Sequence, residues 1–180
     1  MSEQPMSSSG LFFLSRAAAG YYGKVPLVGD FVTRRVSQNT ISIWDNWLRH
    51  GLYEIKNARA STNFIDQHHT TAVWNFVVPP AVAGEQLIGV IGASSDRVGR
   101  QFPFTLFKPF FARPRQQFRL DHITPFFMQH GPIIRALQQR QLGLEQLEYA
   151  LEAVSNWHPE EGQSTGSLTA SGDIFEVLNE

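Results

Sequence analysis

Two segments of the sequence concentrate charged side chains among glycines and prolines. Residues 23–34 read Gly-Lys-Val-Pro-Leu-Val-Gly-Asp-Phe-Val-Thr-Arg, and residues 94–103 read Ser-Ser-Asp-Arg-Val-Gly-Arg-Gln-Phe-Pro. Each segment places a carboxylate and basic groups on a tight, loop-like backbone, where rigid scaffolds usually carry recognition groups. The candidate functional residues are therefore Lys24, Asp30, Arg34, Asp96, Arg97 and Arg100.

Two interpretations of these six residues remain open from the sequence. They form a contact surface for a partner, or they pair with one another where the two loops meet. Buried ion pairs can specify geometry while adding little net stability. Under the second interpretation we expect Asp30 to pair with Arg97 or Arg100. The glycines of the two loops are expected where the backbone needs a positive φ or a close approach: Gly23, Gly29 and Gly99.

A third hypothesis, from a different class, is a small phosphoryl-handling enzyme. Arg97 and Arg100 would clamp phosphate in such an enzyme, because guanidinium groups pair well with phosphate oxygens. Asp30 or Asp96 would act as a base or a metal ligand.

Other patterns associated with catalysis or metal binding are weak. A phosphate-binding loop around Gly23-Lys24 is disfavoured, because Ala18 stands where that motif needs glycine and Val25 where it needs Ser or Thr. The Asp-Gln-His-His stretch at 66–69 has metal-capable side chains but no further spaced ligands. Ser94 and Ser95 are better explained as turn residues that bond to the backbone. We therefore expect no catalytic residue, no metal and no cofactor.

The composition limits the class of partner and the compartment. A formal net charge of -1 provides no field that would attract nucleic acid, and no stretch is apolar enough to insert into a membrane. The absence of cysteine fits a reducing compartment. The apolar cluster at residues 11–14 lacks the basic flank of a signal peptide. We expect a cytoplasmic protein that binds no nucleic acid.

At 180 residues and 42% hydrophobic content, the chain has the size of one packed domain, which we place at residues 11–180 after a disordered tail at residues 1–10. Apolar spacing and turn residues predict the following elements. They are a short strand from Tyr21 that ends in a turn at Pro26; a helix from Thr40; strands at 70–78, 87–91 and 102–111; a helix capped by Thr124 and broken or kinked at Gly131-Pro132; a helix from Leu144 to Val154; a loop at 160–167; and a last strand at 174–178. The strands read as continuous apolar runs, which favours helices on both faces of the sheet. The predicted fold class is α/β, a single-domain three-layer α/β/α sandwich with a mixed sheet.

Large apolar side chains at helical or strand spacing are expected in the core. This applies to Trp44, Trp47 and Trp74. The Phe-Phe-Met trio at 126–128 is wider than one helix face, so part of it is expected to lie exposed and to mark a partner site.

The two charged segments, with Trp44-Asp45-Asn46-Trp47-Leu48 between them, resemble the TagF (ImpM) family of type VI secretion-associated proteins. The family's pattern is Gly-Lys-x-Pro-x-x-Gly-Asp-Phe, then Trp-Asp-x-Trp-Leu, then Ser-x-Asp-Arg-x-Gly-Arg-x-Phe-Pro, and the three motifs occur here in that order. The likeness runs from about residue 21 to residue 111, including the strand with Trp74 and Phe76, and continues more loosely to the C-terminus. Three positions depart from the pattern: Ala93 in place of Pro, Ser95 in place of a branched apolar residue, and Phe104 in place of Leu.

The resemblance implies post-translational repression of type VI secretion, a contractile apparatus that injects effectors, independently of or beside control by threonine phosphorylation. The implied partner is the forkhead-associated scaffold protein of the system, which the repressor would withhold from the assembling machine. The implied fold, an α/β/α sandwich, agrees with the expectation above. Some family members are fused to a phosphatase domain that we do not find here, so no phosphatase activity is expected. A permanent structural subunit of the apparatus is the remaining alternative.

Overall fold

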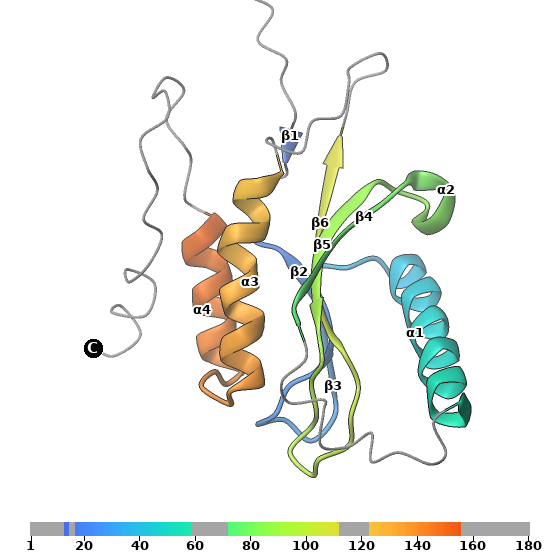
Figure 1. Ribbon diagram of the computed structural model, residues 1–180. Coiled ribbons are helices and arrows are strands. Elements are labelled where there is room, and N and C mark those ends of the chain that lie inside the picture. Colours follow the sequence, from blue (N-terminus) through green and yellow to red (C-terminus); the bar gives the residue numbers. More distant parts are fainter. Residues whose placement is uncertain (1–12, 15–16, 59–71, 112–122, 156–180) are drawn as a thin grey trace, which may run out of the picture.

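The computed structural model describes residues 13–14, 17–58, 72–111 and 123–155. These residues form a sheet with helices on both faces, so the predicted three-layer α/β/α sandwich is confirmed. Figure 1 shows α1 (Gln38–Ala58) on one side of the sheet, and α3 (Thr124–Gln138) and α4 (Leu144–Ser155) on the other. Within these ranges, no helix combines the length and apolarity needed to cross a bilayer.

The sheet runs in the order β3-β2-β6-β5-β4, and the short β1 pairs with β6 outside this path. The strands are β1 (Phe13–Leu14), β2 (Gly20–Lys24), β3 (Phe31–Arg34), β4 (Trp74–Val78), β5 (Leu87–Gly92) and β6 (Phe104–Phe111). Every described pairing is antiparallel, so the prediction of a mixed sheet is wrong. The chain crosses one face through α1 from β3 to β4. These two strands run parallel, but they lie at opposite edges and never become neighbours.

The core between the sheet and α1 is aromatic. Trp44 packs against Phe76 and Phe107, with ring centroids 4.8 and 5.2 Å apart. The indole N–H of Trp44 donates to Oγ1 of buried Thr105 at 3.0 Å, so its polar group is satisfied. Trp44 is buried as predicted, but Trp47 and Trp74 are 60% and 65% exposed, which contradicts the prediction. Helical and strand spacing identified the elements correctly without showing that these two rings extend past the edge of the core.

The core on the opposite face joins β2, β5 and β6 to α3 and α4 through aliphatic and phenylalanine side chains. Within α3, Phe126 is buried, Phe127 is partly buried and Met128 is 55% exposed, so the trio is divided as predicted. His130 stacks on Phe126 with centroids 4.0 Å apart. Its buried Nε2 has no hydrogen-bond partner among the described residues, and burial lowers the pKa of His130 to about 4.

Element boundaries differ from the predictions at several points. Helix α1 begins at Gln38, two residues earlier than predicted, because Ser37 Oγ accepts from the Thr40 N–H. Ile123 and not Thr124 precedes α3, and the helix continues through Pro132 without a break. Strand β3 was missed, because Phe31–Arg34 were treated as part of a loop. The predicted tail at 1–10, the loop at 160–167 and the strand at 174–178 lie outside the described residues.

A short helix, α2 (Pro80–Ala83), lies in the connection between β4 and β5 and begins directly after Pro79. Pro80 suits the first position of this helix, because a backbone N–H at that position would have no acceptor within the helix. The turn ends at Gly84, which adopts a positive φ of 80°. Strand β4 therefore terminates at two consecutive prolines, as the sequence predicted.

Candidate functional site

The three sequence motifs meet around the ring of Phe31, at the start of β3. Phe102 of the third motif packs edge-on against Phe31, with centroids 4.8 Å apart. Lys24 of the first motif holds its Nζ 5.1 Å from the same ring, and Arg49, one residue beyond the second motif, lies 5.7 Å from it. Tyr22 stacks on the other side at 5.7 Å. Residues up to 80 positions apart in sequence, Tyr22 and Phe102, therefore build one aromatic and cationic cluster.

Asp96 is the charged centre of the loop that carries the third motif. Its side chain is fully buried, and its oxygens accept four hydrogen bonds. Lys24 Nζ donates to Oδ2 at 2.9 Å and Arg100 Nε to the same atom at 2.6 Å. The N–H groups of Val98 and Arg100 donate to Oδ1 at 3.1 and 2.8 Å. We call Lys24, Asp96 and Arg100 the ionic frame.

Burial alone would raise the pKa of Asp96. The hydrogen bonds from Lys24 and from the backbone and side chain of Arg100 outweigh this effect and hold the pKa of the carboxyl well below its usual range. Asp96 is therefore a carboxylate at neutral pH with its acceptor positions occupied. Such a group fixes loop geometry and is poorly placed to take up a proton from a substrate.

Three further hydrogen bonds tie residues 24–30 to the loop at 94–102. The N–H of Arg97 donates to the carbonyl of Val28 at 2.9 Å, and Nη2 of Arg100 donates to the carbonyl of Gly29 at 2.8 Å. Ser94 Oγ donates to the carbonyl of Lys24 at 2.7 Å. Ser94 therefore has the backbone-bonding role expected of a turn residue. The two loops behave as one rigid unit held from several directions.

Two of the three motif glycines have the backbone role that was predicted. Gly23 adopts φ +141°, and a Cβ there would lie 2.2 Å from the carbonyl oxygen of Pro103. Gly99 adopts φ +85° at the tip of the second loop. Gly29 was expected to need a positive φ, but it does not adopt one. Its carbonyl is used instead, as the acceptor for Arg100.

The outer part of the loops combines apolar and charged side chains. Leu27 and Val98 are 53% and 68% exposed, and Asp30 and Arg97 are also exposed. We call Leu27, Asp30, Arg97 and Val98 the loop face. The predicted pairing of Asp30 with Arg97 or Arg100 is wrong, because Arg100 pairs with Asp96 and no ion pair joins Asp30 to Arg97 among the described residues. Asp30 instead accepts a hydrogen bond from the N–H of Phe31 at 2.7 Å, as a turn residue at the start of β3.

Arg34 lies at the opposite end of β3 from Asp30, and the structure does not bring it to the ionic frame. Its Nη1 lies 3.5 Å from a carboxylate oxygen of Glu148 on α4, and Nη1 of Arg35 lies 2.8 Å from the other oxygen. Burial, followed by the neighbouring Glu148 carboxylate, raises the pKa of Tyr21 to about 12. This cluster joins the β3 edge to α4 and forms a separate structural contact.

Asp45 of the second motif has a role in joining α1 to the sheet that was not among the predictions. Tyr22 on β2 donates its hydroxyl to Oδ1 of Asp45, and Arg49 Nε donates to Oδ2 at 2.6 Å. Burial and the hydrogen bond to Asp45 raise the pKa of Tyr22 to about 12. The Trp-Asp-x-Trp-Leu order indicates this role, because Asp45 follows the buried Trp44 and faces the sheet beside it.

The described residues offer little support for bond-making chemistry. No group of three or more His, Asp or Glu side chains within the four described ranges could hold a metal ion. The Asp-Gln-His-His stretch at 66–69 lies outside those ranges. So does Gly162-Gln163-Ser164-Thr165-Gly166, which fits the Gly-x-Ser-x-Gly pattern of a nucleophile elbow and was missed. That elbow requires a strand-to-helix turn, whereas this stretch was predicted to be a loop.

Comparisons with known proteins agree with the three motifs. The family model of the TagF N-terminal domain, described as type VI secretion system-associated, matches residues 20–154. Among solved structures, PA0076 from Pseudomonas aeruginosa PAO1 is similar with a TM-score of 0.65 and 27% sequence identity. The likeness covers 76% of this chain and 62% of PA0076, which is less than two thirds of that protein. Comparison with curated proteins gives no match.

Proposed function

The chain belongs to the TagF family of type VI secretion system-associated proteins, and from this premise we propose that it is a cytoplasmic, post-translational repressor of the secretion apparatus. In this proposal it binds the forkhead-associated scaffold protein of the same system. Binding withholds the scaffold from the assembling machine, independently of or beside control by threonine phosphorylation. The repressor needs no catalytic residue, because sequestration alone lowers the concentration of free scaffold.

One observation carries the proposal, namely that buried charges hold an exposed and chemically mixed loop face. Lys24 and Asp96 are buried together, an arrangement that specifies geometry more than it adds stability. The loops that they fix present Leu27 and Val98 beside Arg97. Arginine is enriched at the energetic centre of protein interfaces, and the exposed apolar side chains beside it would leave water on binding. In this proposal both initial interpretations apply, because the ionic frame holds the loops and the loop face makes the contacts.

The phosphoryl-handling alternative has less support. It needs Asp30 or Asp96 as a base or metal ligand, but the oxygens of Asp96 already accept four hydrogen bonds. Asp30 is exposed and caps the N–H of Phe31. A screen of the purified protein for bound metal and for phosphatase and nucleotide hydrolysis tests this alternative. Turnover that disappears in Asp30→Asn would replace the repressor proposal.

A pull-down of the scaffold by the purified protein, beside secretion measured in a deletion strain, tests the proposal. We expect deletion to raise secretion and wild-type protein to capture the scaffold. Arg97→Ala should weaken capture, because its side chain is exposed and only its backbone ties the loops. Arg34→Ala is the matched control, since Arg34 is equally cationic but lies with Glu148.

Unchanged secretion in the deletion strain together with failed capture would refute the proposal. Co-fractionation of the protein with assembled sheath or baseplate would instead support a permanent structural subunit. If Arg97→Ala and Arg34→Ala lose capture equally, the scaffold remains the partner but the loop face is not its binding site. Circular dichroism of each variant confirms that the fold is retained.

A further inference from the structure

The β4 edge of the sheet lacks the protection that the β3 edge has. β3 ends in Arg34 and is followed by Arg35, and charged side chains discourage pairing with another strand. β4 reads Trp-Asn-Phe-Val-Val, without a charged residue, and among the described strands it pairs only with β5. Within the described ranges, its outer backbone groups are therefore available to an added strand, the arrangement used in peptide recognition by strand addition.

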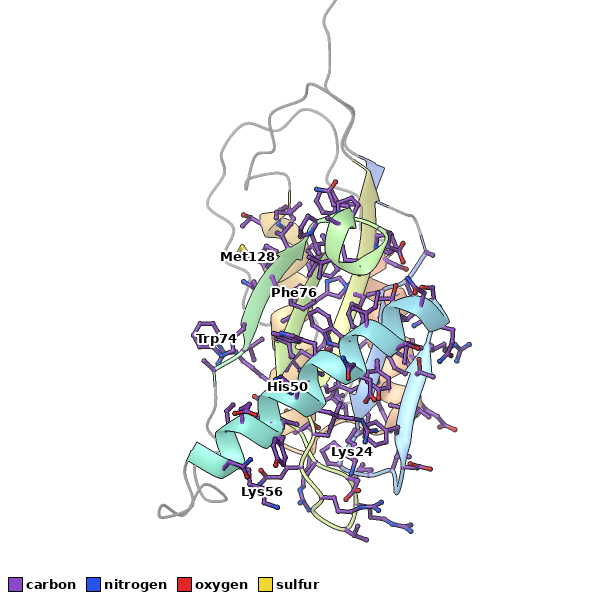
Figure 2. The ribbon with its side chains drawn as sticks, turned by 90° about the vertical axis from the view of Figure 1, so that its right-hand side faces the viewer. Lys24, His50, Lys56, Trp74, Phe76 and Met128 are labelled. Carbon is purple, nitrogen blue, oxygen red and sulfur yellow. The ribbon has the colours of Figure 1, made fainter. Side chains whose placement is uncertain are left out.

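Exposed side chains flank this edge on both faces of the sheet, with aromatic rings on the α1 side and a hollow of mixed polar and apolar lining on the α3 side. On the α1 side lie the exposed rings of Trp74 and Trp47, and Figure 2 shows Trp74 projecting outward at the edge, with Phe76 further inward. On the α3 side, Asn75 of β4 and Met128 of α3 line a hollow of about 430 Å³. Side chains of an added strand would alternate between these two surfaces.

The hollow contains one charged lining residue, Arg135 of α3. Arg135 is exposed and joins no ion pair within the described part of the chain. An occupant complementary to this edge is therefore a short, extended segment that is apolar on both faces and carries one carboxylate on the α3 side.

The chain itself contains such a segment. Residues 174–178 read Ile-Phe-Glu-Val-Leu, which is five residues long, like β4, and rich in residues that favour strands. If Glu176 faces Arg135, strand alternation directs Phe175 and Val177 to the side of Trp74. Eighteen residues lie between Ser155 at the end of α4 and Ile174, and an extended chain of that length reaches roughly 60 Å. This is more than the width of a domain of this size.

We propose that Ile174–Leu178 docks beside β4 as an additional strand, with Glu176 over Arg135 and the apolar side chains on both flanking surfaces. The proposal is independent of the repressor function and of the loop face.

Site-directed spin labelling of the full chain tests this inference. The sequence has no cysteine, so Glu180→Cys provides a single attachment point for a nitroxide close to the proposed strand. We expect the indole N–H signal of Trp74 to lose intensity in the oxidised sample compared with the reduced one. The loss should disappear in Val177→Pro, because proline lacks an N–H and disrupts strand pairing. Val177→Thr, which is β-branched and of similar size, should preserve it.

Hydrogen exchange of the backbone at residues 72–79 provides a second measurement on the same proteins. Protection should fall in Val177→Pro and remain in Val177→Thr. An unaffected Trp74 signal in the labelled chain would overturn the proposal, as would equal protection in both variants. Signal loss that rises with protein concentration would also overturn it, because it would identify a second copy of the chain as the occupant.

Discussion

Replacing Lys24 by methionine tests the buried part of the ionic frame. The Lys24 side chain is 8% exposed, and its Nζ lies 2.9 Å from Oδ2 of Asp96. Methionine keeps an unbranched apolar side chain but removes the charge and the donor. Removing one partner of a buried pair costs about 3–5 kcal/mol, because the other charge is left buried. Since Arg100 and two backbone N–H groups remain, we expect a loss of unfolding free energy near the lower limit, about 3 kcal/mol.

Arg100→Met is the matched control for that experiment. The side chain of Arg100 is 63% exposed, and pairs that include an exposed partner contribute about 1 kcal/mol or less. Urea unfolding distinguishes the two variants, because a slope of about 1–3 kcal/mol per molar urea converts a 3 kcal/mol loss into a midpoint shift of about 1–3 M. A loss in Lys24→Met no larger than that in Arg100→Met would refute the assignment of Lys24 as the buried member of the frame.

Three further predictions concern stability. Gly23→Ala should destabilise the fold by more than about 1 kcal/mol in a urea titration, because φ is +141° and the added carbon would lie 2.2 Å from a backbone oxygen. Gly51→Ala is the control: a Cβ at this position in α1 would meet open space, so the variant should be neutral or stabilising in the same titration. Thr105→Val should lower the free energy of unfolding by about 1–3 kcal/mol, because the buried indole N–H of Trp44 loses its acceptor, and Thr105→Ser should retain most of the stability. The pKa of His130 is about 4 in the folded protein and about 6.5 when unfolded, so the unfolded state binds more protons and stability should fall as pH drops from about 6.5 to 4. Thermal melts across this range should show a decline in melting temperature that His130→Phe reduces. An identical decline in that variant would assign the pH dependence to other groups.

Much of the architecture followed from local patterns in the sequence. The period of the apolar residues located α1 and α4, and the continuous apolar runs at 70–78 and 87–91 predicted strands covered on both faces. The parallel or antiparallel sense of the sheet did not follow. It depends on the edge at which β4 joins the sheet after the α1 crossover, because pairing with β3 would be parallel and pairing with β5 is antiparallel. No local pattern in the sequence specifies that edge.

The candidate site was located by sequence, but its internal pairing was not. Residue types and spacing placed Lys24 and Asp96 in the two charged loops, yet they lie 72 positions apart and their pairing depends on the approach of β2 to the loop after β5. Asp30 was the preferred carboxylate because it stands beside a glycine in a turn. The turn uses its side chain locally, for the N–H of Phe31, and leaves the cations to Asp96.

Exposure of the tryptophans was the other feature that local patterns could not provide. Trp44 and Trp47 are three residues apart on α1, and both were assigned to the core. Trp44 is buried against Phe107 of β6, whereas Trp47 packs on the ring of Trp44 at 5.0 Å and is 60% exposed. The distinction depends on the width of the sheet beneath the helix, which is a tertiary property.

The most direct test of the account is the affinity of the purified forkhead-associated scaffold protein for the wild-type chain and for the double variant Arg97→Ala, Val98→Ser. Both side chains are exposed, so the urea midpoint should stay within the small range typical of surface substitutions. We predict that the dissociation constant rises at least about tenfold, which corresponds to about 1.4 kcal/mol of binding free energy. An unchanged dissociation constant in this folded variant would contradict the claim that the ionic frame exists to present the loop face to a partner.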